Sequence, residues 1–148
     1  MEKYENVERP LNREAIREFE EWLGIKLPAD FIEFYLANNG GNPPFYYVEG
    51  EEHVFALDGF FPIKYGSLTI EQLLKDYEKQ DIAIKGRIPF ASDPGGNVFC
   101  LSTSPTEKGS IYILPSESNP SDNDSYQYVC KSFAAFLAGM TNEPEENG

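Results

Sequence analysis

Four segments of the chain repeat apolar residues at the spacing of an α-helix, in which positions three and four apart share a face. In the first, from Asn12 to Leu23, Ile16 and Phe19 lie on the apolar face together with Leu23, and charged residues occupy the other faces. Asn12 is a suitable N-cap, and Gly24 can end the helix in a left-handed conformation. The same spacing predicts three more helices, over residues 29–38, 69–79 and 132–140.

Between these helices, short runs of β-branched, aromatic and aliphatic residues end at turn residues, a pattern that predicts strands. In residues 126–130 the tyrosines alternate with Gln127 and Val129, so the two sets face opposite sides of a sheet. Such runs predict six strands, at residues 45–48, 54–57, 88–91, 98–101, 111–114 and 126–130. The expected fold class is α+β, with an antiparallel sheet of about five to six strands flanked by N-terminal helices, a middle helix and a C-terminal helix.

Nothing along the sequence marks a boundary between domains. The 148 residues suit one domain, and hydrophobic residues at 41% are enough for a globular core. The many phenylalanines and tyrosines predict a core or a face built from large rings. We therefore expect a single domain over residues 1–148, with flexible ends at 1–10 and at the acidic stretch 141–148.

The distribution of apolar residues predicts where the protein resides. No apolar run is long enough to cross a bilayer, and the charged first ten residues lack the apolar core of a signal peptide. We expect a cytoplasmic protein without membrane contact. Cys100 and Cys130 should then be reduced, and each lies in an apolar strand-like stretch where a buried, inert thiol is expected.

Acidic residues outnumber basic ones by 25 to 12, which gives a net charge of −13. Phosphate backbones repel such a surface, and the basic residues form no local patch, so direct nucleic-acid binding is not expected. An acidic protein is steered toward a basic partner. The alternative is that the acidity only keeps the protein soluble.

Catalysis needs a positioned nucleophile, acid, base or metal, and the sequence offers no clear set. The only histidine, His53, lies among acidic residues at a predicted turn. The glycine-rich loop Asp93–Asn97 is followed by a strand and has no neighbouring lysine, unlike a phosphate-binding loop. Paired histidines and a CxxC pair are absent, and residues 121–125 lack the glycine and glutamate of a calcium loop. We expect no enzymatic activity, no metal site and no cofactor.

Surface recognition is the remaining function that the residues support. Successive side chains of a strand point to opposite faces, so some of the rings in residues 45–47 should face outward, beside several glutamates. The alternative is that these rings pack under the neighbouring helix. An exposed, rigid turn at residues 93–97 is a second candidate contact. The predicted partner-binding residues are Tyr46, Tyr47, Glu49, Glu51, Glu52, Asp93 and Asn97.

Two segments together resemble a known family. Residues 19–41 read FEEWLGIKLPADFIEFYLANNGG, and residues 88–101 read IPFASDPGGNVFCL. The first resembles the N-terminal signature of the SUKH superfamily, in which a helix, a Leu-Pro step and a second helix precede Asn-Gly-Gly. The second is similar to the central hairpin of that family and departs from it at Pro94, which affects turn geometry. The terminal helix at 132–140 also fits, so the resemblance spans nearly the whole chain.

The resemblance implies an α+β fold without catalytic residues. Fungal relatives regulate cell-wall synthesis and signalling, and most bacterial relatives resemble immunity proteins that neutralise toxins, often nucleases or nucleic-acid deaminases. Such toxins tend to be basic, which fits the net charge of −13. The leading hypothesis is an immunity protein, monomeric on its own, that binds one cognate toxin domain. The alternatives are a regulatory scaffold that binds a host protein and, third, a small-molecule-binding domain or an enzyme using scattered carboxylates.

Overall fold

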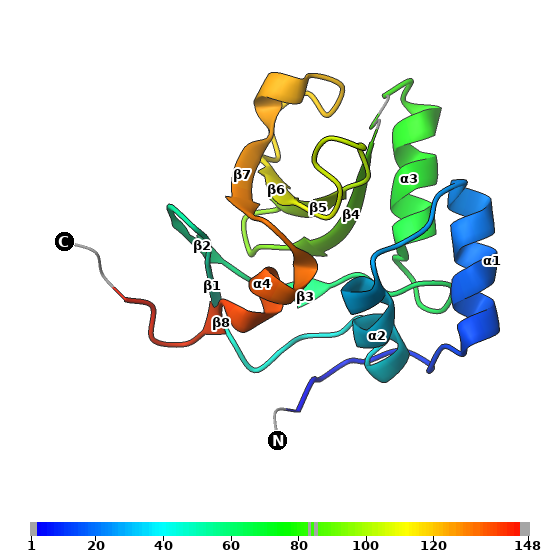
Figure 1. Ribbon diagram of the computed structural model, residues 1–148, viewed down its shortest axis with the longest axis horizontal. Coiled ribbons are helices and arrows are strands. Elements are labelled where there is room, and N and C mark those ends of the chain that lie inside the picture. Colours follow the sequence, from blue (N-terminus) through cyan, green and yellow to red (C-terminus); the bar gives the residue numbers. More distant parts are fainter. Residues whose placement is uncertain (1–2, 83, 85, 146–148) are drawn as a thin grey trace.

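The computed structural model describes residues 3–82, 84 and 86–145 of the protein. All four predicted helices and all six predicted strands are present, each within two residues of its predicted bounds, and the α+β class is confirmed. Figure 1 shows the arrangement of the elements. They are α1 (Arg13–Leu23), α2 (Ala29–Ala37), β1 (Tyr47–Glu49), β2 (Val54–Ala56), β3 (Gly59–Phe60), α3 (Ile70–Lys79), β4 (Arg87–Ser92), β5 (Val98–Ser102), β6 (Ile111–Leu114), the short 3-10 helix η1 (Asn123–Ser125), β7 (Gln127–Cys130), α4 (Phe133–Ala138) and β8 (Met140–Thr141).

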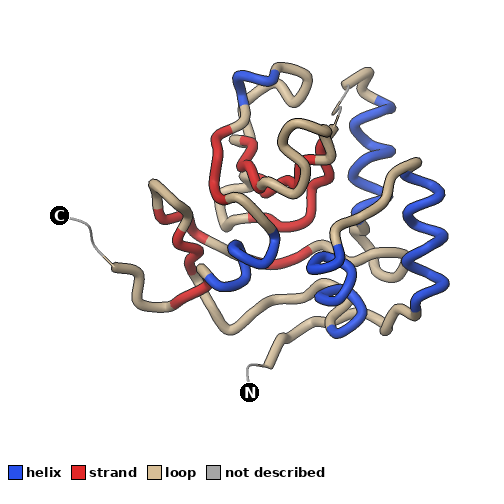
Figure 2. The backbone as a smooth tube through the Cα atoms, viewed as in Figure 1, coloured by secondary structure: helices blue, strands red, loops and turns tan. Residues whose placement is uncertain are grey.

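The strands divide between two antiparallel sheets. The larger sheet has the order β3-β4-β5-β6-β7, so it is a meander, and the smaller has the order β2-β1-β8. In Figure 1, α1 and α3 lie side by side at one side of the molecule and the small sheet lies at the opposite side. Figure 2 shows the larger sheet as a strongly curved band of strands. The short strand β3 lies where Phe60 and Phe61 follow Gly59 before Pro62, a segment whose sequence is also of β type, whereas β8 was not predicted, because two residues are too short for any alternation pattern.

Local sequence signals set the helix ends. Asn12 Oδ1 accepts a hydrogen bond of 2.8 Å from the backbone N–H of Ala15, as expected for an N-cap. Gly24 ends α1 with a φ of 77°, in the left-handed region where glycine is favoured. Ser132 Oγ accepts from the backbone N–H of Ala135 at the start of α4.

The main core is built from phenylalanine rings, as the composition predicts. It lies where α2 and α4 pack on one face of the larger sheet. The ring of Phe133 in α4 lies 4.9 Å from that of Phe31 in α2 and 5.2 Å from that of Phe90 in β4, both edge-to-face. The Tyr35 side chain is buried among them, and its hydroxyl donates to the carbonyl of Phe61. These edge-to-face contacts stabilise the docking of both helices beyond area burial alone.

The other face of the larger sheet carries a second, smaller cluster. Cys100 of β5, Leu114 of β6 and Tyr126, which directly precedes β7, are buried there. Successive residues of β5 therefore alternate between the two clusters, with Phe99 on the main core and Cys100 on the second one. Both faces of the sheet are covered, so these strands carry apolar residues on both sides and do not alternate between apolar and polar residues.

Both ends of the chain make contacts with the domain. The backbones of Glu5 and Asn42 exchange hydrogen bonds of 2.9 and 2.7 Å. At the other end, Thr141 belongs to β8 and the backbone N–H of Glu145 donates to Glu49 Oε1. Flexibility of the two ends stays a prediction, and its extreme parts, residues 1–2 and 146–148, lie outside the described residues.

Candidate protein-binding surface

The β1–β2 hairpin presents tyrosines outward at one end. In its register Tyr47 lies opposite Ala56 and Val48 opposite Phe55. Val48 is fully buried, whereas the exposed fractions are 39% for Tyr47 and 70% for Tyr46, which directly precedes the strand. Tyr46 and Tyr47 therefore face outward, as the first of the two alternatives for this segment predicts. Only Phe45, the third ring, is half-buried.

Two glutamates lie at the tip of this hairpin, where it contacts β7. The backbone N–H of Glu51 donates to the carbonyl of Val129, and Glu51 Oε2 accepts a 2.7 Å hydrogen bond from the hydroxyl of Tyr128. Glu52 is exposed beside it. A Cβ atom on Gly50 would lie 2.7 Å from the Val129 carbonyl oxygen, so only glycine allows this close approach. The tip is held in place, and its carboxylates face solvent.

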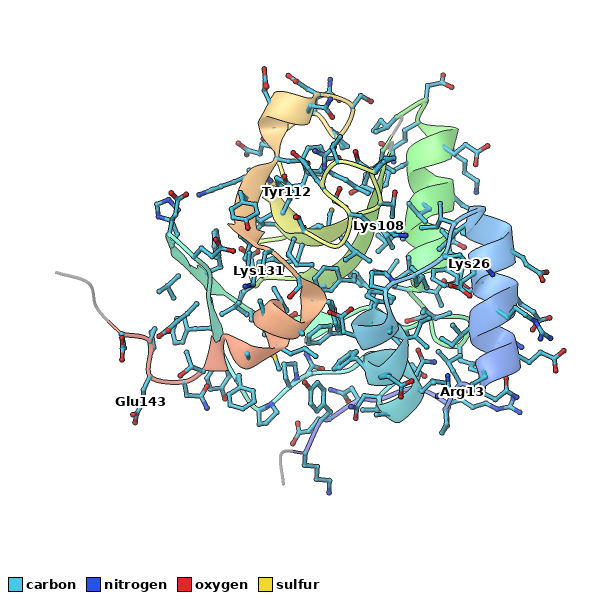
Figure 3. All side chains as sticks on the ribbon, viewed as in Figure 1. Arg13, Lys26, Lys108, Tyr112, Lys131 and Glu143 are labelled. Atoms are coloured by element: carbon cyan, nitrogen blue, oxygen red, sulfur yellow. The ribbon has the colours of Figure 1, made fainter. Side chains whose placement is uncertain are left out.

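Further carboxylates surround the hairpin. Glu49 of β1 accepts from the backbone of Glu145, and Glu143 is exposed on the same C-terminal segment, where Figure 3 labels it. The ion pairs found between described residues lie elsewhere, in α1, α2 and the segment before α3. None of the hairpin carboxylates forms an ion pair with a described residue. We call the set Tyr46, Tyr47, Glu49, Glu51, Glu52 and Val54 the acid–tyrosine surface.

Burial and hydrogen bonding raise the pKa of Tyr128, which touches this surface. Burial is the largest cause, followed by the hydrogen bond to Glu51 and the charge of that carboxylate, and together they raise the pKa to about 12. The phenol therefore stays neutral at physiological pH and remains a donor to the glutamate. This donor fixes one carboxylate of the acid–tyrosine surface in a defined position.

The second predicted contact, the loop at 93–97, uses its polar side chains internally. Asp93 Oδ1 accepts from the backbone N–H groups of Gly95 and Asn97, and its Oδ2 accepts a 2.6 Å bond from the Asn97 amide. Asn97 Oδ1 in turn accepts from the backbone N–H of Ser116. Asp93 and Asn97 thus shape the hairpin turn, and the residues left exposed between them are Pro94, Gly95 and Gly96.

The structure brings the two predicted contact regions to one cavity. A cavity of about 520 Å³ is lined by Tyr46, Leu57 and Asp58 from the hairpin side and by Pro94 from the loop. Asn142, which also lines it, accepts from the backbone N–H of Tyr46 and donates to the carbonyl of Pro44. This cavity extends the acid–tyrosine surface toward Pro94, and Asp93 and Asn97 are not among the residues that line it.

A comparison with known protein families assigns the chain to a family. Residues 10–139 match the SMI1/KNR4 family (SUKH-1), a span that includes both signature segments. The chain belongs to the SMI1/KNR4 family. A search of curated proteins found no match. Among the described residues, no helix is long and apolar enough to cross a membrane.

The SMI1/KNR4 signature residues have structural roles here. The buried Asn39 amide donates to the carbonyls of Arg9 and Ile63 and accepts from the backbone N–H of Ile63, so it joins three parts of the chain. Gly40 has a φ of 76°, and a Cβ there would lie within 2.9 Å of the backbone of Phe60 and Pro62. The Asn-Gly-Gly motif therefore stabilises the fold at a buried position.

The two cysteines of this family member are free and buried. Burial raises the pKa of the Cys100 thiol to about 12 and that of Cys130 to about 11. Both thiols are thus protonated and unreactive at neutral pH, as expected from the sequence. Within the described part of the chain, no three His, Cys, Asp or Glu side chains gather as a metal site.

The sequence analysis missed one polar group on the second face of the larger sheet. Arg87, the first residue of β4, places its guanidinium over the rings of Tyr112 and Tyr126. Its role depends on the register of four strands, which the sequence does not reveal. The only available signal was the predicted alternation in residues 126–130, which put Cys130 on the face of the two tyrosines and Val129 on the other. That part was wrong: Tyr126 lies in the second cluster, but Val129 and Cys130 both lie in the main core, because a register shift interrupts the pairing of β6 with β7.

Proposed function

We propose that this chain is a cytosolic immunity protein that binds and neutralises a basic bacterial toxin domain acting on nucleic acid. The proposal rests on membership of the SMI1/KNR4 family, many of whose bacterial relatives resemble immunity proteins. The observation that carries it in this chain is the acid–tyrosine surface, which combines exposed rings with carboxylates that form no ion pair with the described residues.

The chemistry of this surface fits a basic protein partner. Exposed tyrosines such as Tyr46 and Tyr47 supply large contact areas at small conformational cost, and Tyr is enriched among the residues that dominate binding energy. Carboxylates beside them steer a cationic partner and set its orientation. A toxin that acts on nucleic acid carries such a cationic surface, because its substrate is a polyanion.

Neutralisation in this proposal needs binding alone, without catalysis. The carboxylates of Glu49, Glu51 and Glu52 occupy positions on the toxin that substrate phosphates otherwise take. One monomer of this chain then blocks one toxin domain. Because the attraction is electrostatic, the association rate falls as salt is added, while the dissociation rate changes less.

A second candidate function is supported by the family itself. The SMI1/KNR4 family also contains fungal regulators of cell-wall synthesis and signalling, and the same surface would then bind a host protein. The two functions differ in what deletion of the gene does. Loss of a regulator gives a phenotype without any toxin, whereas loss of an immunity protein matters only when the toxin is present.

The test is calorimetric binding to the C-terminal domain of the large protein encoded beside this gene, with that domain's toxicity assayed in parallel. Nanomolar affinity together with abolished toxicity is the expected result. A toxic neighbour that this chain neither binds nor neutralises contradicts the proposal. A gene without such a neighbour, and with a deletion phenotype of its own, favours the regulatory function.

A further inference from the structure

A second cavity, of about 510 Å³, opens on the face of the larger sheet opposite the main core. It lies between β4, β6 and the loop that joins β5 to β6, where Figure 3 labels Tyr112 and Lys108. Small-molecule sites in proteins have volumes of roughly 300–1,000 Å³. The polar lining residues that matter here are Arg87, Ser104, Thr106, Glu107, Tyr112 and Asn123.

Arg87 is held rigidly at this cavity. Its guanidinium carbon lies 3.8 Å from the ring centre of Tyr126 and 5.2 Å from that of Tyr112. Its Nη1 donates a 3.0 Å hydrogen bond to Asn123 Oδ1. Two ring contacts and one hydrogen bond therefore position the cation before any ligand arrives, and this lowers the ordering cost of binding.

The guanidinium of Arg87 forms no ion pair within the described residues, although the chain has 25 acidic residues. Its Nε is buried and makes no hydrogen bond to any described residue. A partly buried cation without an ion-pair partner is costly, and an unsatisfied buried polar atom calls for an explanation. A bound carboxylate would supply an ion-pair partner for the guanidinium, whereas the buried Nε has no surface that a ligand could reach.

The carboxylate residue Glu107 lines the same cavity. The pKa of Tyr112 is raised to about 12, first by burial and then by the hydrogen bond and the charge of Glu107, while Arg87 acts in the opposite direction. Arg87 and Glu107 line the same cavity and shift the pKa of Tyr112 in opposite directions. They form no ion pair with each other within the described structure. The cavity holds two opposite charges apart.

We propose that this cavity binds a small zwitterion of the free amino acid class, with its carboxylate on Arg87 and its ammonium on Glu107. A ligand with no net charge is not repelled by a protein of charge −13, whereas a free anion is. The hydroxyls of Ser104 and Thr106, which lie 3.1 Å apart, offer further hydrogen bonds to the ligand. The site uses none of the acid–tyrosine surface, so its test is independent of the proposed toxin.

The experiment follows the Arg87 Nε–H resonance by NMR in the isotope-labelled full chain. Each standard L-amino acid is added separately to about 10 mM, beside acetate and methylammonium, which carry only one of the two charges. We expect a saturable shift with at least one amino acid and a dissociation constant in the millimolar range. Acetate and methylammonium should bind at least about tenfold more weakly, because each loses one charged contact.

Variants separate the two charged contacts. Arg87→Gln and Glu107→Gln should each weaken binding at least about tenfold, and Glu117→Gln, an exposed glutamate outside the cavity, should leave binding unchanged. If Arg87→Gln fails to fold, the exposed Glu107→Gln still decides. The absence of any saturable shift with every amino acid overturns the proposal. So does unchanged affinity in Glu107→Gln, or acetate binding as tightly as the best amino acid.

Discussion

The family signature and the acid–tyrosine surface differ in what their polar side chains do. In the signature, the amide of Asn39 and the carboxylate of Asp93 direct their hydrogen bonds to nearby groups of the chain itself. In the hairpin, Tyr46 and Glu52 are exposed to solvent. The buried and internally bonded signature residues therefore support the fold, whereas the acid–tyrosine surface carries the exposed groups that we propose contact a partner.

Replacement of a signature residue should have the largest effect, and on stability. Asn39→Ala removes three hydrogen bonds at a fully buried site and leaves the Ile63 backbone unsatisfied. We expect a loss of about 3 kcal/mol in the free energy of unfolding, measured by urea denaturation. The matched control is Asn142→Ala, which removes two exposed hydrogen bonds and should cost less than about 1 kcal/mol. Equal losses would contradict the distinction between the two regions.

Charge reversal in the hairpin should have the next largest effect, and on binding. The triple variant Glu49→Lys, Glu51→Lys and Glu52→Lys should weaken toxin affinity about 100-fold, because attraction becomes repulsion at the contact. Calorimetry measures the affinity, and urea denaturation checks that the variant folds.

The matched control for this variant changes the net charge equally at sites away from the hairpin. Glu21→Lys, Glu78→Lys and Glu117→Lys alter exposed glutamates that make no ion pair in the described structure. This control should lose less than about tenfold in affinity, since only long-range steering changes. If both triple variants lose the same affinity, net charge matters and the hairpin does not.

Removal of a single ring should have a smaller effect. Tyr46 is 70% exposed, so Tyr46→Ala should hardly change stability while it weakens toxin binding about tenfold. The control is Trp22→Ala, an exposed ring on α1 at 49%, which should leave the affinity unchanged. A loss of affinity with Trp22→Ala alone would move the contact to the helical side of the molecule.

The smallest effect concerns the cysteines and appears at alkaline pH. The pKa values of Cys100 and Cys130 are raised by burial to about 12 and about 11, from an ordinary value of 9.0. Above pH 9.0 the unfolded chain therefore loses thiol protons that the folded chain keeps, so stability falls as pH rises toward the folded values. Denaturation at a series of pH values measures this slope, and Cys130→Ala should reduce it. A thiol reagent that labels the native protein rapidly at pH 8 would contradict the burial.

Local signals predicted most of the fold, and non-local contacts account for the rest. The caps Asn12 and Ser132 and the ending at Gly24 lie within a few residues of the bonds they make, so the sequence reveals them. Strands β3 and β8 exist only because distant segments pair with them. The division into two sheets has the same origin.

The candidate site was predictable to a similar extent. Alternation along β1 indicated that some rings face outward, and Tyr46 and Tyr47 are exposed. The internal bonding of Asp93 and Asn97 could not be foreseen, because a turn sequence does not reveal which of its side chains stabilise the turn itself. Arg87 was missed because its neighbours come from strands far apart in the sequence.

The most direct test of the central claim is backbone hydrogen exchange of this chain, free and bound to the neighbouring toxin domain. If the acid–tyrosine surface is the contact, the amides of residues 46–54 exchange more slowly in the complex, and those of α1 and α3 keep their free rates. Slower exchange confined to α1 and α3, with residues 46–54 unchanged in a tight complex, would contradict the account.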